Sequence, residues 1–459
     1  MGVNFSAFEI GRRALRASQL GLTITGQNIA NVNTPGYTRQ QVELPPIGSN
    51  LVPGGNGVTL DGIRAVRDQF VEARLQTETG ITGRLTGRRD ALALVDAVFN
   101  DANTAGGIHA ALNGFFNAYS DLEAQPTSVQ QRAIVVAKAE TLTQAFHSTR
   151  GRLTEIRTGV DEELRITVDQ ANELAQQVAD LNAQISIAEN SGGNTFTLRD
   201  QRAELARQLT ALTGARAVET DNQLTLTLAD GNALVVGGQA FALTATSVPP
   251  EGLAALTLNG SPANLTDGRL RGLQDALGEI GGYLTSLDQL AESLAERVNT
   301  LHVAGSDLDG NNGTDFFTST GGGTVTAANL DVAAALKADP RLVVAAANGA
   351  GSGDATIARS LAGLLQDRNS VVGGVTVSYE SFYAGLVTQA GSDIRLAEDT
   401  LATQQLILTQ TQEQRNSVSG VSLDEEAVSL LQYQKAYEAA VRFLKVADEM
   451  TQTIMSLTQ

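Results

Sequence analysis

Large and small apolar residues alternate at regular intervals along the first thirty residues. A seven-residue repeat places Phe8, Leu15, Leu22 and Ile29 on one line, with the small residues Gly11, Ser18 and Thr25 between them. Such a heptad predicts an amphipathic helix whose small positions let a partner helix come very close. The pattern stops at Asn31 and Asn33, and Pro35 disfavours helical backbone at the residue before it. We therefore predict a helix over about 5–30, followed by extended chain and turns over 38–60.

A second amphipathic helix is predicted at the other end of the chain. Ser422 and Glu425 have the spacing of a capping box, which marks a helix start. One apolar stripe then follows, made of Leu430, Tyr433, Tyr437, Ala440, Leu444, Ala447, Met450, Ile454 and Leu457. The two ends are complementary in charge, because residues 1–41 hold four arginines and one glutamate (4 − 1 = +3), whereas residues 421–459 hold three basic and six acidic residues (3 − 6 = −3). Opposite charges favour pairing of the two helices.

Helical periodicity also dominates the middle of the chain. It covers residues 66–94, 111–126, 128–190, 270–302 and 379–414, and the 128–190 stretch is long enough for a coiled-coil-like rod. The glycines of "NSGGN" (190–194) break that rod, and residues 198–212 are predicted to run back along it. The period changes to two around Asp230-Gly231, a hairpin signal, and residues 256–265 predict a further strand and turn. Residues 305–325 are loop-rich and 326–371 are mixed α and β.

These patterns predict a mainly α, elongated protein, built as a long helical coiled coil or bundle with paired terminal helices and a small β-rich insertion. We divide the chain into four parts: an inner terminal-helix domain (1–60 with 415–459), a helical rod-like domain (61–215 with 266–304 and 372–414), a β-hairpin subdomain (216–265) and a short outer segment (305–371).

Composition excludes several classes of function. The chain has 459 residues and a formal net charge of −18, which argues against binding to nucleic acid or to an anionic membrane surface. It has no cysteine, so disulfides, cysteine-ligated metals and thiol catalysis are all excluded. We find no apolar run of membrane-spanning length and no apolar core of a cleavable signal peptide near the start.

No catalytic or cofactor-binding constellation is evident in the sequence. The histidines, His109, His147 and His302, are far apart, and each is expected to be a partly exposed residue without a metal role. "DLDGNNG" (307–313) resembles a calcium loop but has Asn312 and Thr318 where an EF-hand needs glycine and glutamate, so we expect a turn. "GAGSGDAT" (349–356) lacks the lysine of a phosphate loop, and Asp354 is expected to cap a helix over 355–366.

The terminal motifs resemble those of a known family. "ANVNTPGYTRQ" (30–40) is similar to the N-terminal motif of bacterial flagellar axial proteins, the rod, hook and hook-associated proteins, and "SLDEEAVSLLQYQKAYEAAVRFLKVADEMTQTIMSL" (422–457) is similar to their C-terminal motif. In the middle, "LRDQRAELARQL" (198–209) and "LKADPRLVVAA" (336–346) resemble the hook-associated members that form the hook–filament junction. The resemblance covers nearly the whole chain, although larger relatives have a substantial outer domain where this chain has only about 319–371.

The resemblance implies a structural protein with no enzymatic activity and no cofactor. It implies export through the flagellar type III apparatus without a cleaved signal peptide, and an extracellular location at the hook–filament junction. The implied partners are other copies in a ring, the hook protein, the next hook-associated protein towards the filament, and an export chaperone on the C-terminal helix (423–457). The predicted assembly interface consists of Phe8, Leu15, Leu22, Asn28, Ile29, Asn31, Asn33, Pro35, Gly36, Tyr37, Leu430, Tyr433, Tyr437, Leu444, Ile454 and Leu457.

Two other functions stay open at this point. A hook or rod protein would share the terminal motifs, but its outer domains would be mostly β, whereas residues 128–212 and 270–302 are helical in pattern. A secreted enzyme that cleaves the cell wall would need a paired acidic site in a compact domain, and no segment offers one.

Overall fold

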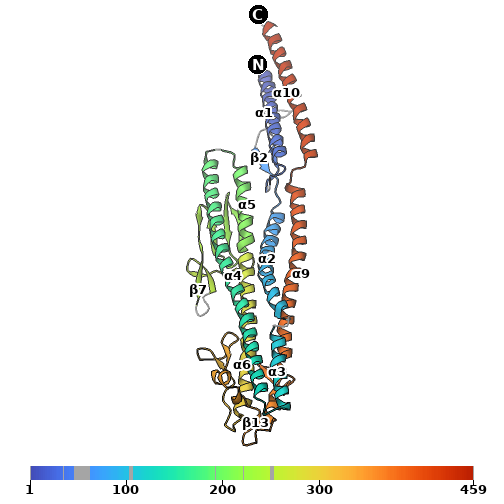
Figure 1. Ribbon diagram of the computed structural model, residues 1–459. Coiled ribbons are helices and arrows are strands. Elements are labelled where there is room, and N and C mark those ends of the chain that lie inside the picture. The colour runs from blue at the N-terminus through green and yellow to red at the C-terminus, as the bar shows by residue number, and fades with distance from the viewer. Residues whose placement is uncertain are drawn as a thin grey trace. The chain divides into compact units, whose positions relative to one another are not determined.

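The computed structural model describes residues 2–34, 36–45, 62–102, 107–191, 193–220, 222–248 and 253–457. Long helices make up most of these residues, so the mainly α prediction is confirmed (Figure 1). Two compact units can be distinguished. Unit 1 comprises residues 1–82, 171–243 and 404–459, and unit 2 comprises 83–170 and 244–403. The four-part division made from the sequence stays a prediction, and the turn-rich stretch expected over 46–60 lies outside the described residues.

The helices agree closely with the predicted periodic segments. They are α1 (Gly2–Ala30), α2 (Gln69–Ala102), α3 (Ile108–Ala124), α4 (Val129–Asn190), α5 (Phe196–Thr213), α6 (Arg269–Val303), α7 (Ala334–Ala338), α8 (Thr356–Gly363), α9 (Tyr379–Ser419) and α10 (Leu423–Leu457), with a 3-10 turn at Pro340–Leu342. The predicted long rod is α4, which has 62 residues. Helix α5 follows a short turn and runs back along α4, as the sequence indicates.

The strands are short and antiparallel. They are β1 (Gln40–Glu43), β2 (Gly62–Ala65), β3 (Arg216–Thr220), β4 (Gln223–Thr227), β5 (Ala233–Val236), β6 (Gln239–Ala240), β7 (Leu243–Val248), β8 (Leu253–Leu258), β9 (Ser261–Pro262), β10 (Gly305–Ser306), β11 (Phe317–Ser319), β12 (Leu330–Val332), β13 (Ala346–Ala347), β14 (Val371–Val372) and β15 (Val375–Thr376). The larger sheets have the orders β3-β4-β5-β6 and β7-β8-β9, and the other strands form two-stranded pairs.

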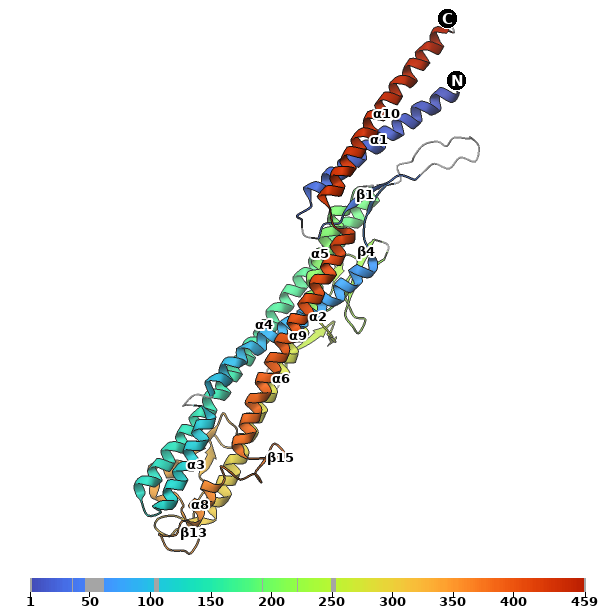
Figure 2. The same cartoon turned by 90° about the vertical axis from the view of Figure 1, so that its right-hand side faces the viewer.

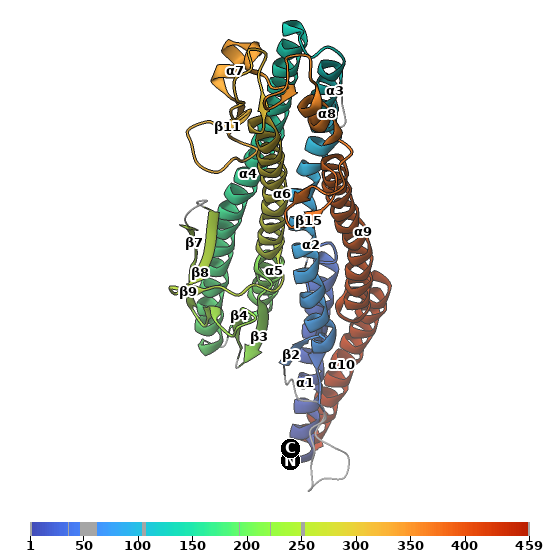
Figure 3. The same cartoon turned by 90° about the horizontal axis from the view of Figure 1, so that it is seen from below.

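In unit 1, the four-stranded sheet packs against the α4–α5 hairpin (Figure 3). The predicted period of two is visible in β4, where Leu224 and Leu226 are buried and face one side. Asn182 of α4 fastens the sheet, because its amide nitrogen donates to the carbonyl oxygens of Leu224 and Gly237, both at 2.8 Å. The β4–β5 turn contains Gly231 with φ +85°, a conformation that glycine adopts without strain.

In unit 2, helix α6 supplies one long buried stripe, which includes Leu273, Ile280, Leu287, Leu294 and Val298. Helix α2 lies against α6 at close range, since a Cβ added at Gly272 would overlap the backbone of Arg84. Two ion pairs one helical turn apart, Arg84 with Asp275 and Arg88 with Glu279, both at 2.8 Å, keep the helices in register.

Unit 2 contains a buried aromatic cluster. Phe115 and Tyr119 of α3 contact Phe316 with ring centroids 5.6 and 6.1 Å apart, and all three side chains are buried. His302 packs edge-on against Phe316 and is fully buried, so the prediction of a partly exposed residue is wrong for this histidine. His109 and His147 are partly exposed, as expected.

Hydrogen bonds on both sides explain why His302 is buried. Its Nε2 accepts the backbone N–H of Val344 at 3.0 Å, so Nδ1 carries the proton and donates to the carbonyl oxygen of Thr314. Burial lowers the pKa of this imidazole to about 4, which keeps it neutral. The "DLDGNNG" stretch forms a turn in which the buried Asp307 carboxylate accepts the backbone N–H groups of Asp309 and Asn311, both at 2.9 Å.

Candidate functional site

Helices α1 and α10 of unit 1 lie side by side, with the two chain ends at the same end of the pair (Figures 1 and 2). Two glycines of α1 allow the close approach that the small heptad positions predict. A Cβ added at Gly11 would overlap Leu444, and one added at Gly21 would overlap the ring of Tyr433. The seam between the helices is therefore a set of large α10 side chains seated in gaps left by glycine.

Most of the other buried residues of α1 are also small or polar. Ala17, Ser18 and Thr25 are buried, together with the larger Ile24. Pairing with α10 therefore buries the small side of α1. The predicted apolar row of Phe8, Leu15, Leu22 and Ile29 lies at the edge of the seam, and each of these side chains is half-buried.

On α10, the predicted residues Leu430, Tyr433, Tyr437 and Leu444 are half-buried as well. Further apolar side chains of α10 are exposed, namely Val428, Leu431, Val446 and Met450, which are 53 to 57% exposed. The placement of Pro35, and the side chains of Ile454 and Leu457, lie outside what the structure describes. The helix pair thus retains accessible apolar surface on both of its members.

A group of hydrogen-bonded polar residues around Asn28 and Glu426 joins the two helices at the end of the pair away from the chain termini, and we call this group the polar anchor. Asn28 is almost completely buried and is fully hydrogen-bonded. Its Nδ2 donates to the Gln40 carbonyl oxygen at 2.9 Å and to Glu426 Oε2 at 3.0 Å. Its Oδ1 accepts the Tyr37 hydroxyl at 2.9 Å and the Gln40 backbone N–H at 3.1 Å. One amide therefore ties the end of α1, the turn after it and the start of α10 together.

Arg39 completes the anchor from the other side. Its Nε donates to Glu426 Oε1 at 2.7 Å, and its Nη1 donates to Glu425 Oε2 at 2.6 Å. Glu426 is buried, whereas the Glu425 side chain is 63% exposed. Helix α10 begins directly after Ser422, as the predicted capping box indicates. The Glu425 side chain, however, binds Arg39, whereas in a capping box it would accept the backbone N–H of Ser422.

The turn is also fastened to α5 and α9 within unit 1. Asp200 of α5 accepts the Thr38 backbone N–H at 3.1 Å and pairs with Arg67 at 2.6 Å. Arg415 of α9 donates to the Gly36 carbonyl oxygen at 3.2 Å. Partial burial, with Asp200 and Glu426 nearby, raises the pKa of Tyr37 to about 12, so its hydroxyl stays a hydrogen-bond donor at neutral pH.

The other predicted turn residues have smaller roles. Asn31 Nδ2 donates to the Gln27 carbonyl oxygen at 2.9 Å, and Asn31 Oδ1 accepts the Thr34 hydroxyl at 3.2 Å. Asn33 is exposed. Gly36 has φ +79°, a conformation that favours glycine where the chain changes direction.

Sequence reasoning missed most of the anchor. Arg39, Gln40, Asp200 and Glu426 supply the contacts that complete it, and none of them was among the predicted interface residues. A signal for Glu426 was present, since the capping box drew attention to its neighbour Glu425. No local signal links Asp200, which lies in an ordinary charged helix, to a turn near the N-terminus.

The described residues hold no group of three or more His, Asp or Glu side chains placed to bind a metal ion. Nor, over the same residues, is any helix both long and apolar enough to cross a membrane. The geometry of the site is that of a packing surface with a buried polar anchor.

Comparison with known proteins agrees with this geometry. The family model of the flagellar hook-associated protein FlgK helical domain matches residues 92–317, that of the flagellar basal body rod FlgEFG protein C-terminal region matches 412–457, and that of the flagella basal body rod protein matches 8–38. The chain belongs to the flagellar hook-associated protein family.

Relatives in this family are similar along their whole length. Flagellar hook-associated protein 1 of Bacillus subtilis is 28% identical, and the match covers 99% of this chain and 99% of that protein. The protein of the same name in Escherichia coli is 26% identical, with 96% and 98% covered. The flagellar hook junction protein FlgK of Burkholderia pseudomallei has a similar fold, with a TM-score of 0.66 and 16% identity over 76% of this chain and all of that structure.

Proposed function

We propose that this protein is a structural axial component of the bacterial flagellum that forms the junction between hook and filament and is the platform on which the filament assembles. The full-length similarity to flagellar hook-associated protein 1 carries this proposal. The terminal helix pair supports it, because the pair leaves apolar surface accessible on both α1 and α10.

The mechanism is packing without turnover. Copies of this chain assemble into a ring, in which the accessible apolar side chains of one terminal helix pair are covered by its neighbours. Because burial of apolar surface is favourable at about 25 cal/mol per Å², a ring gains stability that a single pair lacks. The ring contacts the hook protein on one side and the next hook-associated protein on the other.

Assembly is coupled to the ordering of the helix ends. Ordering the backbone of one residue costs about 1–2 kcal/mol, and the seam of α1 consists largely of small side chains that bury little surface. The anchor around Asn28 and Glu426 orders the helix pair at its base, and contacts with neighbouring copies stabilise the part of the pair nearer the termini.

Export follows the flagellar type III route as an unfolded chain, with a chaperone on the C-terminal helix. The apolar surface of residues 423–457 needs cover before assembly, which makes this helix the chaperone site. A truncated chain that lacks 423–459 should lose chaperone binding in a pull-down with the purified chaperone. Binding that persists would assign the chaperone to another part of the chain.

The junction role is tested by electron microscopy of cells that lack this gene, together with an assay for flagellin in the medium. We expect complete hooks without filaments, and flagellin lost to the medium. Missing or malformed hooks would instead make this a hook or rod protein. Normal filaments would refute an axial role.

A further inference from the structure

The α4–α5 hairpin of unit 1 has a second apolar row besides the one that covers the sheet. Residues Leu174, Leu181 and Ala188 of α4 and Leu198, Leu205 and Leu212 of α5 recur every seven residues, and all six are half-buried. Helix α5 runs back along α4, so the two rows run in opposite directions. When Leu181 is beside Leu205, seven residues back on α4 and seven residues forward on α5 place Leu174 beside Leu212. This is the seam that a third helix would fill in a coiled-coil arrangement.

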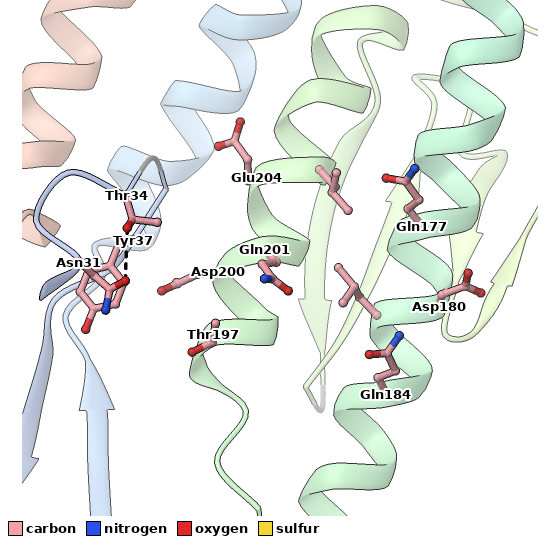
Figure 4. Close-up of a pocket in the computed structure, with 12 residues that line it drawn as sticks. Asn31, Thr34, Tyr37, Gln177, Asp180, Gln184, Thr197, Asp200, Gln201 and Glu204 are labelled. Carbon is pink, nitrogen blue, oxygen red and sulfur yellow. Dashed lines mark hydrogen bonds between the residues drawn. The ribbon is translucent and has the colours of Figure 1, made fainter. Parts of the chain in front are cut away.

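An open recess lies over the middle of this row (Figure 4). It has a volume of about 550 Å³, and both Leu181 and Leu205 line it. Gln177 and Gln184 project from α4 along one side, and Tyr37 closes the opposite end. A recess of this size between two leucine-bearing helices matches the apolar side chains of a helix laid along the hairpin.

The rim of the recess is acidic. Asp180, Asp200 and Glu204 line it, and among the residues that the structure describes no lysine or arginine does. Asp200 is paired with Arg67 at 2.6 Å and Glu204 with Arg207 at 2.7 Å, whereas Asp180 is exposed on α4. Glu173, one heptad before Asp180, is exposed on the same helix. A helix that fits here carries an apolar heptad with positive charges beside it.

Helix α1 has these features along the edge of its seam with α10. Phe8, Leu15 and Leu22 share the seven-residue spacing of the hairpin row, about 10.5 Å per step. Arg12 and Arg16 flank this stripe and are exposed. Since α1 is packed on α10 within its own chain, the helix that fills the recess comes from another copy.

We propose that the Phe8–Leu15–Leu22 stripe of α1 docks in the leucine groove between α4 and α5 of a neighbouring copy, antiparallel to α4, with Arg16 facing Asp180. This inference rests on the proposed function, since it requires that copies of the chain assemble side by side. It assigns the contact between copies to one face of α1 and one groove of unit 1.

Engineered cysteines test the contact directly, because the natural chain has none. Gln19 is exposed between Leu15 and Leu22, and Gln177 lines the groove. The full chain with both Gln19→Cys and Gln177→Cys is expressed in place of the natural chain, flagella are isolated and oxidised, and covalent dimers are counted on denaturing gels. We expect efficient disulfide formation between copies.

The matched control replaces Gln177→Cys by Gln176→Cys. Gln176 is the preceding residue, also exposed, and is turned about 100° around α4 away from the groove. We expect at least tenfold less dimer from the control pair. Equal yields from both pairs, or no dimer from either, would overturn the inference. Dimers that form only when Gln432→Cys of α10 replaces Gln19→Cys would overturn it too, because α10 would then be the occupant.

A charge exchange provides a second measurement on the same crosslink. Asp180→Lys should lower the yield of dimer from Gln19→Cys with Gln177→Cys at least fivefold, and addition of Arg16→Glu should restore it. No response to either change would contradict the proposed orientation. If filaments grow normally while the crosslink fails, the junction function stands and only this contact is refuted. The gene deletion, for which we expect bare hooks, tests the junction function separately.

Discussion

Arg39 and Glu426 form an ion pair of 2.7 Å although they lie 387 residues apart in the sequence. Only 3% of the Glu426 side chain and 16% of the Arg39 side chain are exposed. The pair therefore connects the turn after α1 to the start of α10 where water does not compete for the charges. Asn28 donates to the same carboxylate, so loss of Glu426 would leave two buried donors without an acceptor.

Glu426→Ala should destabilise unit 1 strongly. Arg39 keeps its pair with Glu425, but the buried Asn28 amide N–H and the Arg39 Nε–H lose their acceptor, and a buried group left unsatisfied costs about 1–3 kcal/mol. The free energy of unfolding, measured by urea titration with circular dichroism on the purified chain, should fall by roughly this amount. Glu425→Ala is the control, since Glu425 pairs with the same arginine but is exposed, and its loss should cost less than about 1 kcal/mol. Equal effects would mean that the pair is not buried in solution.

Asn28→Ala should lower the free energy of unfolding more than Asn33→Ala does. Asn28 uses both donors and both acceptors of its amide, and a buried group left unsatisfied costs about 1–3 kcal/mol. Asn33 is exposed, so its replacement should change the free energy of unfolding by less than about 0.5 kcal/mol. Asn28→Ala should also reduce filament retention in a shear assay. Unchanged stability of Asn28→Ala would argue against the anchor.

Gly21→Ala and Gly26→Ala test the close approach of α1 and α10. A methyl group at Gly21 would overlap the Tyr433 ring, whereas nothing lies within 4 Å of the same position at Gly26. Gly21→Ala should destabilise the helix pair by about 1–3 kcal/mol through overpacking. Gly26→Ala should stabilise α1 by up to about 1 kcal/mol, since alanine favours helix. Helix content and thermal unfolding, both followed by circular dichroism, separate the two. Stabilisation by both would contradict the seam.

His302 should make the stability of unit 2 depend on pH. Above pH 6.5 the imidazole is neutral in the folded and the unfolded chain. Between pH 6.5 and about 4 only the unfolded chain takes up the proton, so the free energy of unfolding decreases as the pH falls. Each unit of the pKa difference corresponds to about 1.4 kcal/mol, and the loss ends below the folded pKa.

The measurement compares urea unfolding of the natural chain and His302→Gln from pH 7 to pH 4. Glutamine has a donor and an acceptor but does not titrate, so the variant should be less stable at pH 7 and should have a shallower decline towards pH 4. His109→Gln, at a side chain that is 45% exposed, serves as the control. Parallel curves for the natural chain and His302→Gln would show that this histidine does not contribute to the pH dependence.

Leu22→Gln should separate assembly from folding. Leu22 is half-buried at the edge of the seam with α10, so the free energy of unfolding of the purified chain should change by about 1 kcal/mol or less. The same change places a polar group in the contact between copies, so swimming speed and filament number per cell should fall sharply. Thr23→Gln, at the exposed neighbouring position, should leave both unchanged. Normal motility of Leu22→Gln would exclude this stripe from the assembly contact.

The secondary structure and the presence of a pairing seam follow from local patterns in the sequence. The 128–190 periodicity became α4 almost residue for residue, and the small heptad positions Gly11, Ser18 and Thr25 lie on the buried side of α1. This succeeded because helix and strand periods are local properties, repeated over many residues, and because glycine in a heptad allows close helix approach whatever the partner.

Which polar groups are buried together depends on contacts between segments that are distant in the sequence. Glu425 and Glu426 are adjacent and chemically alike, yet Glu426 is buried against Asn28 and Arg39 whereas the Glu425 side chain is exposed. Asp200 reaches the 36–39 turn, and His302 binds Thr314 and Val344, through contacts that no local pattern encodes. Local spacing specifies which side of a helix is apolar, whereas the partner of a single polar group depends on where distant segments meet.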